Sequence, residues 1–208
     1  MTKYSGLTGV SSGLATHEWG VNEAGASKKI NLGQVKTYVG TGLSNASLTT
    51  VSAAYAVDTY LAGSSVTIPT AGGWVAGSFY RCTFDMTKTA AGTVGFAINV
   101  RMGTAGTTAD PVIATVTFAG GTAAADLGVF SVIGTFRSVG AGTAAVLRAT
   151  ASLVHTLTLS GLTSNNVAGA TSAGFNSTTQ TKIGLSINGG TSFSGTNETV
   201  VATLDKYQ

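Results

Sequence analysis

From about Leu48 onward, apolar and polar residues alternate with a period of two. In the run SFYRCTFDM, residues 78–86, the apolar side chains share one face: Tyr80, Cys82, Phe84 and Met86. The run TVGFAINVRM, residues 93–102, likewise places five apolar residues on an inward face: Val94, Phe96, Ile98, Val100 and Met102. Asn99 and Arg101 fall on the outward face. This alternation predicts β-strands with one buried side.

Further runs of the same kind follow at residues 112–119, 128–139, 144–159, 182–187 and 199–205, separated by clusters of Gly, Thr, Ser and Asn. Eight or so strands with no helical pattern between them predict an all-β, antiparallel sandwich or barrel. The strands and loops are long, and the Cys and Trp hallmarks of immunoglobulin domains are missing. These features favour a jelly roll.

The first forty residues follow another pattern and predict an N-terminal extended arm. Residues 1–20 are rich in Ser, Thr and Gly, which suits an adaptable segment. In NLGQVKTYVG, Asn31 is a good N-cap and Gly40 a good C′ residue. Between them Leu32, Val35 and Val39 follow an i, i+3, i+7 spacing, which predicts a short helix that must dock on a partner to be stable. The chain therefore divides into an arm, residues 1–45, and a jelly-roll domain, residues 46–208.

Charge is scarce, and this changes the expected assembly. Charged residues make up 9% of the 208 positions, against about 25% in an average globular protein. Outward strand positions carry Thr, Ser, Ala or Gly, whereas exposed sheet edges are usually guarded by charge. A small monomer with so little charge tends to associate. We therefore expect a homotrimer, the alternative being a monomer with an uncharged surface.

Several partner classes are not expected. The four arginines are scattered one per predicted strand, whereas nucleic-acid binders gather basic residues on one face. No apolar run approaches the roughly 18 residues of a membrane span. The N-terminus lacks the apolar core of a signal peptide, which argues against Sec export. A single cysteine excludes an internal disulfide framework.

Residues that could carry catalysis have simpler interpretations. His155 is in register with apolar neighbours on its strand, as a satisfied, half-buried histidine would be, and His17 lies in the arm. Cys82 shares a face with aromatic residues, which indicates a buried structural thiol. Asp110 and Asp126 lie in predicted loops, where an Asp side chain commonly caps a turn. We expect no catalytic residues, no metal site, no cofactor and no enzymatic activity.

Three features favour protein contacts. Trp19 and Trp74 are amphipathic residues of the kind enriched at interfaces, although Trp74 is equally well explained as a core aromatic residue. The Ser/Thr/Asn-rich segment 160–180 is either an exposed tip that touches a host or a plain connecting loop.

The stretch ATHEWGVNEAGASKKINLGQVKTYV, residues 15–39, resembles an N-terminal segment of tail and other minor virion proteins of tailed bacteriophages. Such segments run as a Pro-Val-Asn or similar tripeptide, a short turn, paired lysines, then Thr-Leu-x-Gln-Leu and Tyr. Here Val21-Asn22 lacks the proline, Lys28-Lys29 is intact, and NLGQV at residues 31–35 opens the predicted helix. Residues 58–110, with gaps, are similar to jelly-roll domains of phage structural proteins. The resemblance implies a structural protein on the exterior of the virion, made in the host cytoplasm.

The segment 25–40 is then interpreted as an attachment peg. Its apolar stripe would dock on another virion protein, and lysines at the rim would speed encounter with an acidic surface. The residues expected to make this contact are Trp19, Lys28, Lys29, Leu32, Val35, Lys36 and Val39. The alternative is that the helix packs beneath its own jelly roll and the lysines are solvated.

The function expected from these features is that of a homotrimeric capsid decoration, or cement, protein on the outside of the head. It would bind the major capsid protein or other virion proteins through many weak contacts that combine by multivalency. The alternative is a short tail fibre or receptor-binding protein that attaches to a host surface glycan. The arm passes into strands within roughly twenty residues, which leaves no room for a fibre shaft and favours decoration. A glycan-degrading depolymerase is a third class, unsupported by any pair of acids.

Overall fold

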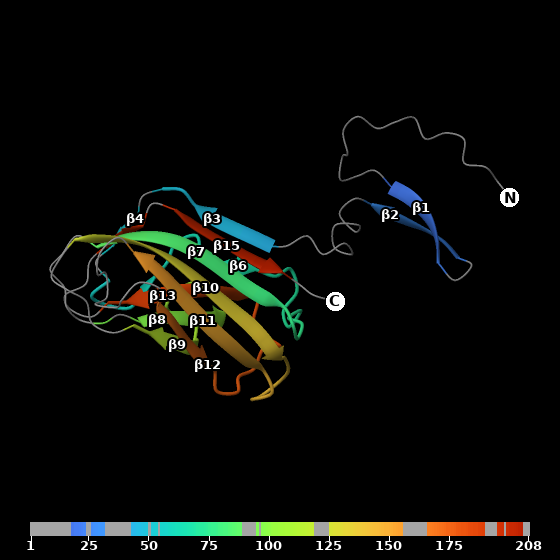
Figure 1. Ribbon diagram of the computed structural model, residues 1–208. Coiled ribbons are helices and arrows are strands. Elements are labelled where there is room, and N and C mark those ends of the chain that lie inside the picture. The colour runs from blue at the N-terminus through green and yellow to red at the C-terminus, as the bar shows by residue number, and fades with distance from the viewer. Residues whose placement is uncertain are drawn as a thin grey trace. The chain divides into compact units, whose positions relative to one another are not determined.

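The computed structural model describes residues 18–23, 26–31, 43–49, 51–53, 55–88, 95, 97–118, 125–155, 166–189, 195–197 and 199–205. The chain forms two compact units, residues 1–41 and 42–208. The described part of the first unit is an antiparallel hairpin of β1 (Glu18–Glu23) and β2 (Ala26–Asn31) (Figure 1). Lys28 and Lys29 therefore lie in a strand. The helix expected over residues 31–40 lies outside the described residues, apart from Asn31, which ends β2.

The second unit is a sandwich of two sheets. Within the described residues, the large sheet has eight strands in the order β12-β11-β10-β7, and next to β7 come the pairs β15-β3 and β14-β4. Its strands are β3 (Leu43–Ser47), β4 (Val51–Ala53), β7 (Phe79–Lys88), β10 (Asp126–Ser138), β11 (Val146–His155), β12 (Asn166–Thr171), β14 (Gly195–Asn197) and β15 (Val200–Asp205).

The small sheet has the order β5-β13-β8-β9, with β6 also paired to β13. Its strands are β5 (Thr59–Tyr60), β6 (Val66–Thr67), β8 (Ala97–Gly103), β9 (Val112–Thr117) and β13 (Lys182–Asn188). Every strand pair among the described residues is antiparallel. The predicted all-β, antiparallel class is thus confirmed.

The core lies between the two sheets and is built from the predicted inward faces. The apolar residues of β7 and β8 expected inside are buried: Tyr80, Cys82, Phe84, Met86, Ile98, Val100 and Met102. Phe84 and Phe130 stack with ring centroids 4.9 Å apart, and the ring of Phe118 meets Phe130 edge-on at 5.9 Å. Val94 and Phe96, expected on the same inward face, lie outside the described residues.

Trp74 belongs to this core. Its ring stacks on Phe136 at a centroid distance of 5.1 Å, and its indole N–H donates to the carbonyl oxygen of Gln180 at 2.9 Å. The structure therefore favours the core interpretation of Trp74, and the contact-anchor interpretation is wrong. Because both the apolar ring and the polar N–H are satisfied inside the sandwich, neither is presented to a partner.

The segment 160–180 is not one long loop. Residues 166–171 form β12, which pairs with β11. Beyond it, Phe175 and Ala145 exchange two backbone hydrogen bonds of 3.0 and 3.1 Å, and Ser177 is buried. The loop interpretation is therefore wrong for residues 166–171, which form a strand, while residues 172–181 connect β12 to β13 and include exposed residues such as Ala173 and Thr178. Residues 160–165 lie outside the described part.

Candidate functional site

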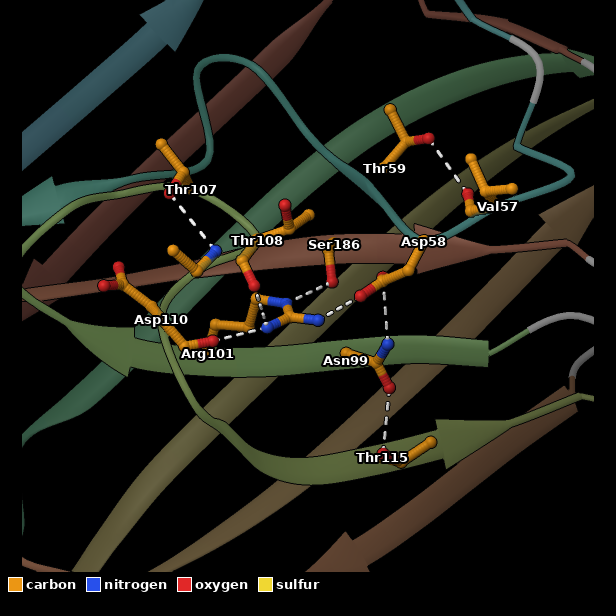
Figure 2. A network of polar contacts seen from close by, with 11 residues as sticks. Val57, Asp58, Thr59, Asn99, Arg101, Thr107, Thr108, Asp110, Thr115 and Ser186 are labelled. Carbon is orange, nitrogen blue, oxygen red and sulfur yellow. Dashed lines mark hydrogen bonds and ion pairs between the residues drawn. The ribbon is translucent and has the colours of Figure 1, made fainter.

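A network of polar contacts is centred on Arg101 of β8, on the face of the small sheet that points away from the core (Figure 2). Asn99 and Arg101 lie on the outward face, as predicted, yet they are only 8% and 7% exposed. The reason is that two loops, residues 55–58 and 104–110, carry groups that hydrogen-bond to these side chains.

The Arg101 guanidinium is surrounded by oxygen atoms. Its Nε donates to Ser186 Oγ at 2.7 Å, and its Nη1 donates to the backbone carbonyls of Thr108, at 2.9 Å, and Asp110. Its Nη2 forms an ion pair with Asp58. A planar guanidinium can bind several acceptors at fixed angles at once. Arg101 therefore joins both loops to the neighbouring strand β13.

The network continues across the sheet to β9. The second carboxylate oxygen of Asp58 accepts from Asn99 Nδ2 at 3.1 Å, and Asn99 Oδ1 accepts from the Thr115 hydroxyl at 2.9 Å. The side chain of Asp58 is 28% exposed, so the ion pair is partly accessible to solvent. The Asp58 carboxylate already accepts from Arg101 and Asn99. This pattern suits a structural anchor for loops better than a general base.

Asp110 confirms its expected role as a turn cap. Its Oδ1 accepts from the backbone N–H groups of Thr104 and Ala105 at 3.1 and 3.0 Å, and its Oδ2 accepts from that of Gly106 at 2.6 Å. Charge-assisted bonds of this kind are stronger than neutral ones. Asp110 thus closes the 104–110 loop with its side chain, while its carbonyl oxygen binds Arg101.

Gly103 makes room for this cap. A Cβ at Gly103 would lie 2.8 Å from Asp110 Cβ and closer still to its carboxylate. We expect Gly103→Ala to lower the free energy of unfolding by about 1–3 kcal/mol, as overpacking does. The control is Gly134→Ala in β10, where the new Cβ meets only ordinary contacts at 3.4 Å and should change stability by less than about 1 kcal/mol. Urea unfolding of both variants checks this, and equal losses would contradict the role of Gly103.

A second cluster of ionisable side chains lies inside the sandwich, where β7, β10 and β11 end. Asp126 is the first residue of β10, and it is paired in register with Lys88 of β7. Its Oδ2 lies 3.2 Å from His155 Nδ1, and its Oδ1 accepts from the Leu127 N–H at 2.8 Å. Lys88 is buried; desolvation lowers the pKa of its amine, and the Asp126 charge opposes that shift. The prediction of a satisfied His155 is confirmed.

Neither cluster has the composition of a metal site. Among the residues that the structure describes, no group of three or more His, Cys, Asp or Glu side chains is placed to hold a metal ion. In the same part of the chain, no helix has the length and apolar character needed to cross a membrane. What the Arg101 network does is hold two loops in a defined shape on the outer face of the small sheet.

The residues predicted for virion attachment lie in the other unit. Trp19 is in β1 opposite Ile30, and Lys28 and Lys29 of β2 lie opposite Val21 and Gly20. The other four expected contact residues lie outside the described part of the chain: Leu32, Val35, Lys36 and Val39. The structure therefore brings three of the seven onto one hairpin.

The Arg101 network was missed by sequence reasoning. One signal was present: the long, turn-rich stretch MGTAGTTADP between two strands, in which an acidic residue, Asp110, precedes the final proline. A hairpin loop of that length needs side-chain anchors to hold one conformation, and an arginine in the preceding strand is a natural partner for its carbonyl groups. The partner Asp58, over forty residues away, could not be found in this way.

No family model matches the chain, and no curated protein matches it. Among solved structures, the chain is similar to lectin I from Ulex europaeus in complex with the methyl glycoside of alpha-L-fucose. The two are 11% identical, the match covers 79% of this chain and 98% of the lectin chain, and the TM-score is 0.37. A match this weak identifies neither a family nor a function.

Proposed function

We propose that the protein is a non-enzymatic structural protein of a tailed-phage virion, and that it acts as a capsid decoration protein on the outside of the head. The observation that carries this proposal is the division of the chain. In the sandwich, the buried charge of Arg101 binds the carbonyl groups of a loop of the same unit. A separate N-terminal unit contains a hairpin with paired lysines. Such a chain suits a rigid knob with an attachment segment.

The jelly-roll topology and the homotrimer are parts of this proposal. The chain runs from β7 in the large sheet to β8 and β9 in the small sheet, and returns to β10, β11 and β12 in the large sheet. It then crosses to β13 and back to β15. This repeated crossing supports a jelly roll. Exposed apolar side chains on β10, β11 and β12 support self-association: Leu127, Val129, Val154 and Val167.

The attachment segment consists of the β1–β2 hairpin and the residues that follow it, with Lys28, Lys29 and Lys36 at the rim of the contact. We expect the triple variant Lys28→Ser/Lys29→Ser/Lys36→Ser to associate with particles about tenfold more slowly at low salt, because rim charges act mainly on the rate of encounter. Binding of the purified variant to particles that lack the protein measures this.

The matched control removes the same charge from the sandwich, at the exposed arginines Arg81, Arg137 and Arg148. If Ser at these three positions slows association as much as the lysine variant does, the effect comes from net charge and the attachment role of the lysines is wrong. The oligomeric mass of both variants should equal that of the unaltered chain.

The copy number in purified virions tests the location. A number in fixed ratio to the major capsid protein, measured by quantitative mass spectrometry, would support head decoration. A number far below it would place the protein on the tail and favour the alternative, a short tail fibre or receptor-binding protein that attaches to a host surface glycan. Absence from the particle would overturn the virion proposal.

A further inference from the structure

One side of the sandwich consists of two stacked sheet edges. Among the described strands, β12 pairs only with β11 at the end of the large sheet, and β9 pairs only with β8 at the end of the small sheet. β9 and β12 also contact each other, so the two edges lie on the same side of the molecule (Figure 1). We call this the β9/β12 side.

The β12 edge has little of the usual protection against pairing, whereas β9 carries a bulge-type register shift opposite Val100 and Arg101. The sequences of β12, NVAGAT, and of β9, VIATVT, contain no charged residue and no proline. Edge strands of soluble proteins normally carry lysine, proline or a bulge, because their unpaired backbone groups otherwise pair with another strand. Arg148 of β11 places a charge beside β12: its guanidinium donates to Thr171 Oγ1 at 3.2 Å and also lies against Gly169, in the middle of the strand.

The backbone of β12 has donors that point away from the sandwich. The N–H of Ser172, just after β12, donates to the carbonyl oxygen of Leu147 in β11 at 2.9 Å. In an antiparallel pair, alternate residues direct their N–H groups to opposite sides. The N–H groups of Val167, Gly169 and Thr171 therefore point outward, where they could donate hydrogen bonds to the carbonyl oxygens of an added strand.

Exposed valines line this edge on the outer face of the large sheet. Val167 of β12 is 68% exposed, and Val154 of β11 is 63% exposed. Val167 is paired in register with Ser152, so Val154 is its diagonal neighbour across the two strands. Val154 is in turn paired with Val129 of β10, which is also exposed. A strand added at β12 would cover part of this apolar strip.

The opposite side of the large sheet ends in a second uncharged strand. Among the described strands, β3 pairs only with β15, and it too is uncharged, with the sequence LSNAS. Its five residues match the six of β12 in length. Two uncharged strands can meet without burying an unpaired charge. Different surfaces on two copies give a head-to-tail contact, which forms a ring such as a trimer when the rotation between copies closes.

We propose that the β9/β12 side binds a second copy of this chain, with β12 of one copy pairing to β3 of the next. The inference rests on the homotrimer of the proposed function and names its contact surface. The backbone hydrogen bonds of the added strand provide affinity, and the valine strip provides apolar burial.

The test places a lysine at each side of the proposed contact. Val167→Lys in β12 and Ala46→Lys in β3 alter exposed side chains and should each weaken self-association about tenfold or more. The control is Val57→Lys in the 55–58 loop, where the valine is 69% exposed, nearly the same as Val167. Sedimentation equilibrium over a range of concentrations gives the mass and the association constant of each variant. Circular dichroism confirms that the variants fold.

Each outcome bears on a separate claim. The expected result is a mass three times the 20.7 kDa chain for the unaltered protein and for Val57→Lys, with both edge variants dissociating. If the edge variants keep the full mass, the surface assignment is wrong while the trimer stands. If they keep it but bind particles less well, the edge belongs to another virion protein, and the inference is overturned. A monomeric unaltered chain overturns both the trimer and this inference, and leaves virion incorporation to be judged by copy number.

Discussion

Replacing Arg101 by Met is expected to lower the free energy of unfolding by about 3–5 kcal/mol, the usual effect of removing one partner of a buried ion pair. The substitution leaves the Asp58 carboxylate without its cation and takes a donor from Ser186 Oγ and from the carbonyls of Thr108 and Asp110. The methionine side chain fills similar space but donates no hydrogen bond. The two loops over the small sheet should loosen together.

Arg148→Met is the control for this experiment. Arg148 is exposed and its guanidinium donates a hydrogen bond to Thr171 Oγ1, so its loss should change stability by less than about 0.5 kcal/mol. Urea unfolding at one fixed protein concentration gives both values, since association of copies would otherwise add to stability. Similar losses for the two variants would show that the Arg101 network contributes no more than a surface contact.

The second large effect is a loss of stability at alkaline pH. Burial raises the pKa of Cys82 from 9.0 to about 12 and that of Tyr55 from 10.0 to about 12, and it raises the pKa of Tyr80 well above 10.0. In the unfolded chain these groups lose their protons near the ordinary values, while the folded protein keeps them. The unfolded state then binds fewer protons, so the free energy of unfolding falls as pH rises. Each group contributes about 1.4 kcal/mol per pH unit.

The stabilisation by Cys82 is therefore full below pH 9 and is lost progressively between pH 9 and about 12. Urea unfolding at a series of pH values should show a free energy of unfolding that begins to fall near pH 9. The fall should steepen near pH 10, where Tyr55 and Tyr80 begin to lose their protons in the unfolded chain. Cys82→Ala creates a cavity and lowers the whole curve, but it should remove the part of the decline that begins near pH 9. An unchanged slope between pH 9 and 10 in this variant would contradict the assignment to Cys82.

The strands that the sequence predicted are those with a strong period-two pattern. In β7 and β10, large apolar residues alternate with polar or small ones, and each alternate side chain faces the other sheet. The missed strands lack this signal. β12 reads NVAGAT, in which the residues are small and uncharged, and it is a strand because β11 provides a hydrogen-bonding partner. The lysine-rich β2 was missed for the same reason, since its partner β1 shows no clear alternation either.

The candidate site also contains one contact that the sequence predicted and one that it did not. The capping role of Asp110 was predictable, because it depends on backbone groups four to six residues away in the chain. The contact of Arg101 with Asp58 was not, because the two are forty-three residues apart and meet only when the 55–58 loop crosses β8. Distant contacts of this kind leave no periodic trace in the sequence.

By itself, the sequence determined the all-β class, the inward faces of the main strands and the buried state of Cys82, since alternation along a strand decides which side chains face a core. Only the tertiary structure decided that Trp74 is internal, that residues 166–171 complete a sheet, and that Asn99 and Arg101 are covered on the outward face. The physical reason is that alternation separates the two faces of a sheet. What covers the outer face depends on loops brought there by the fold.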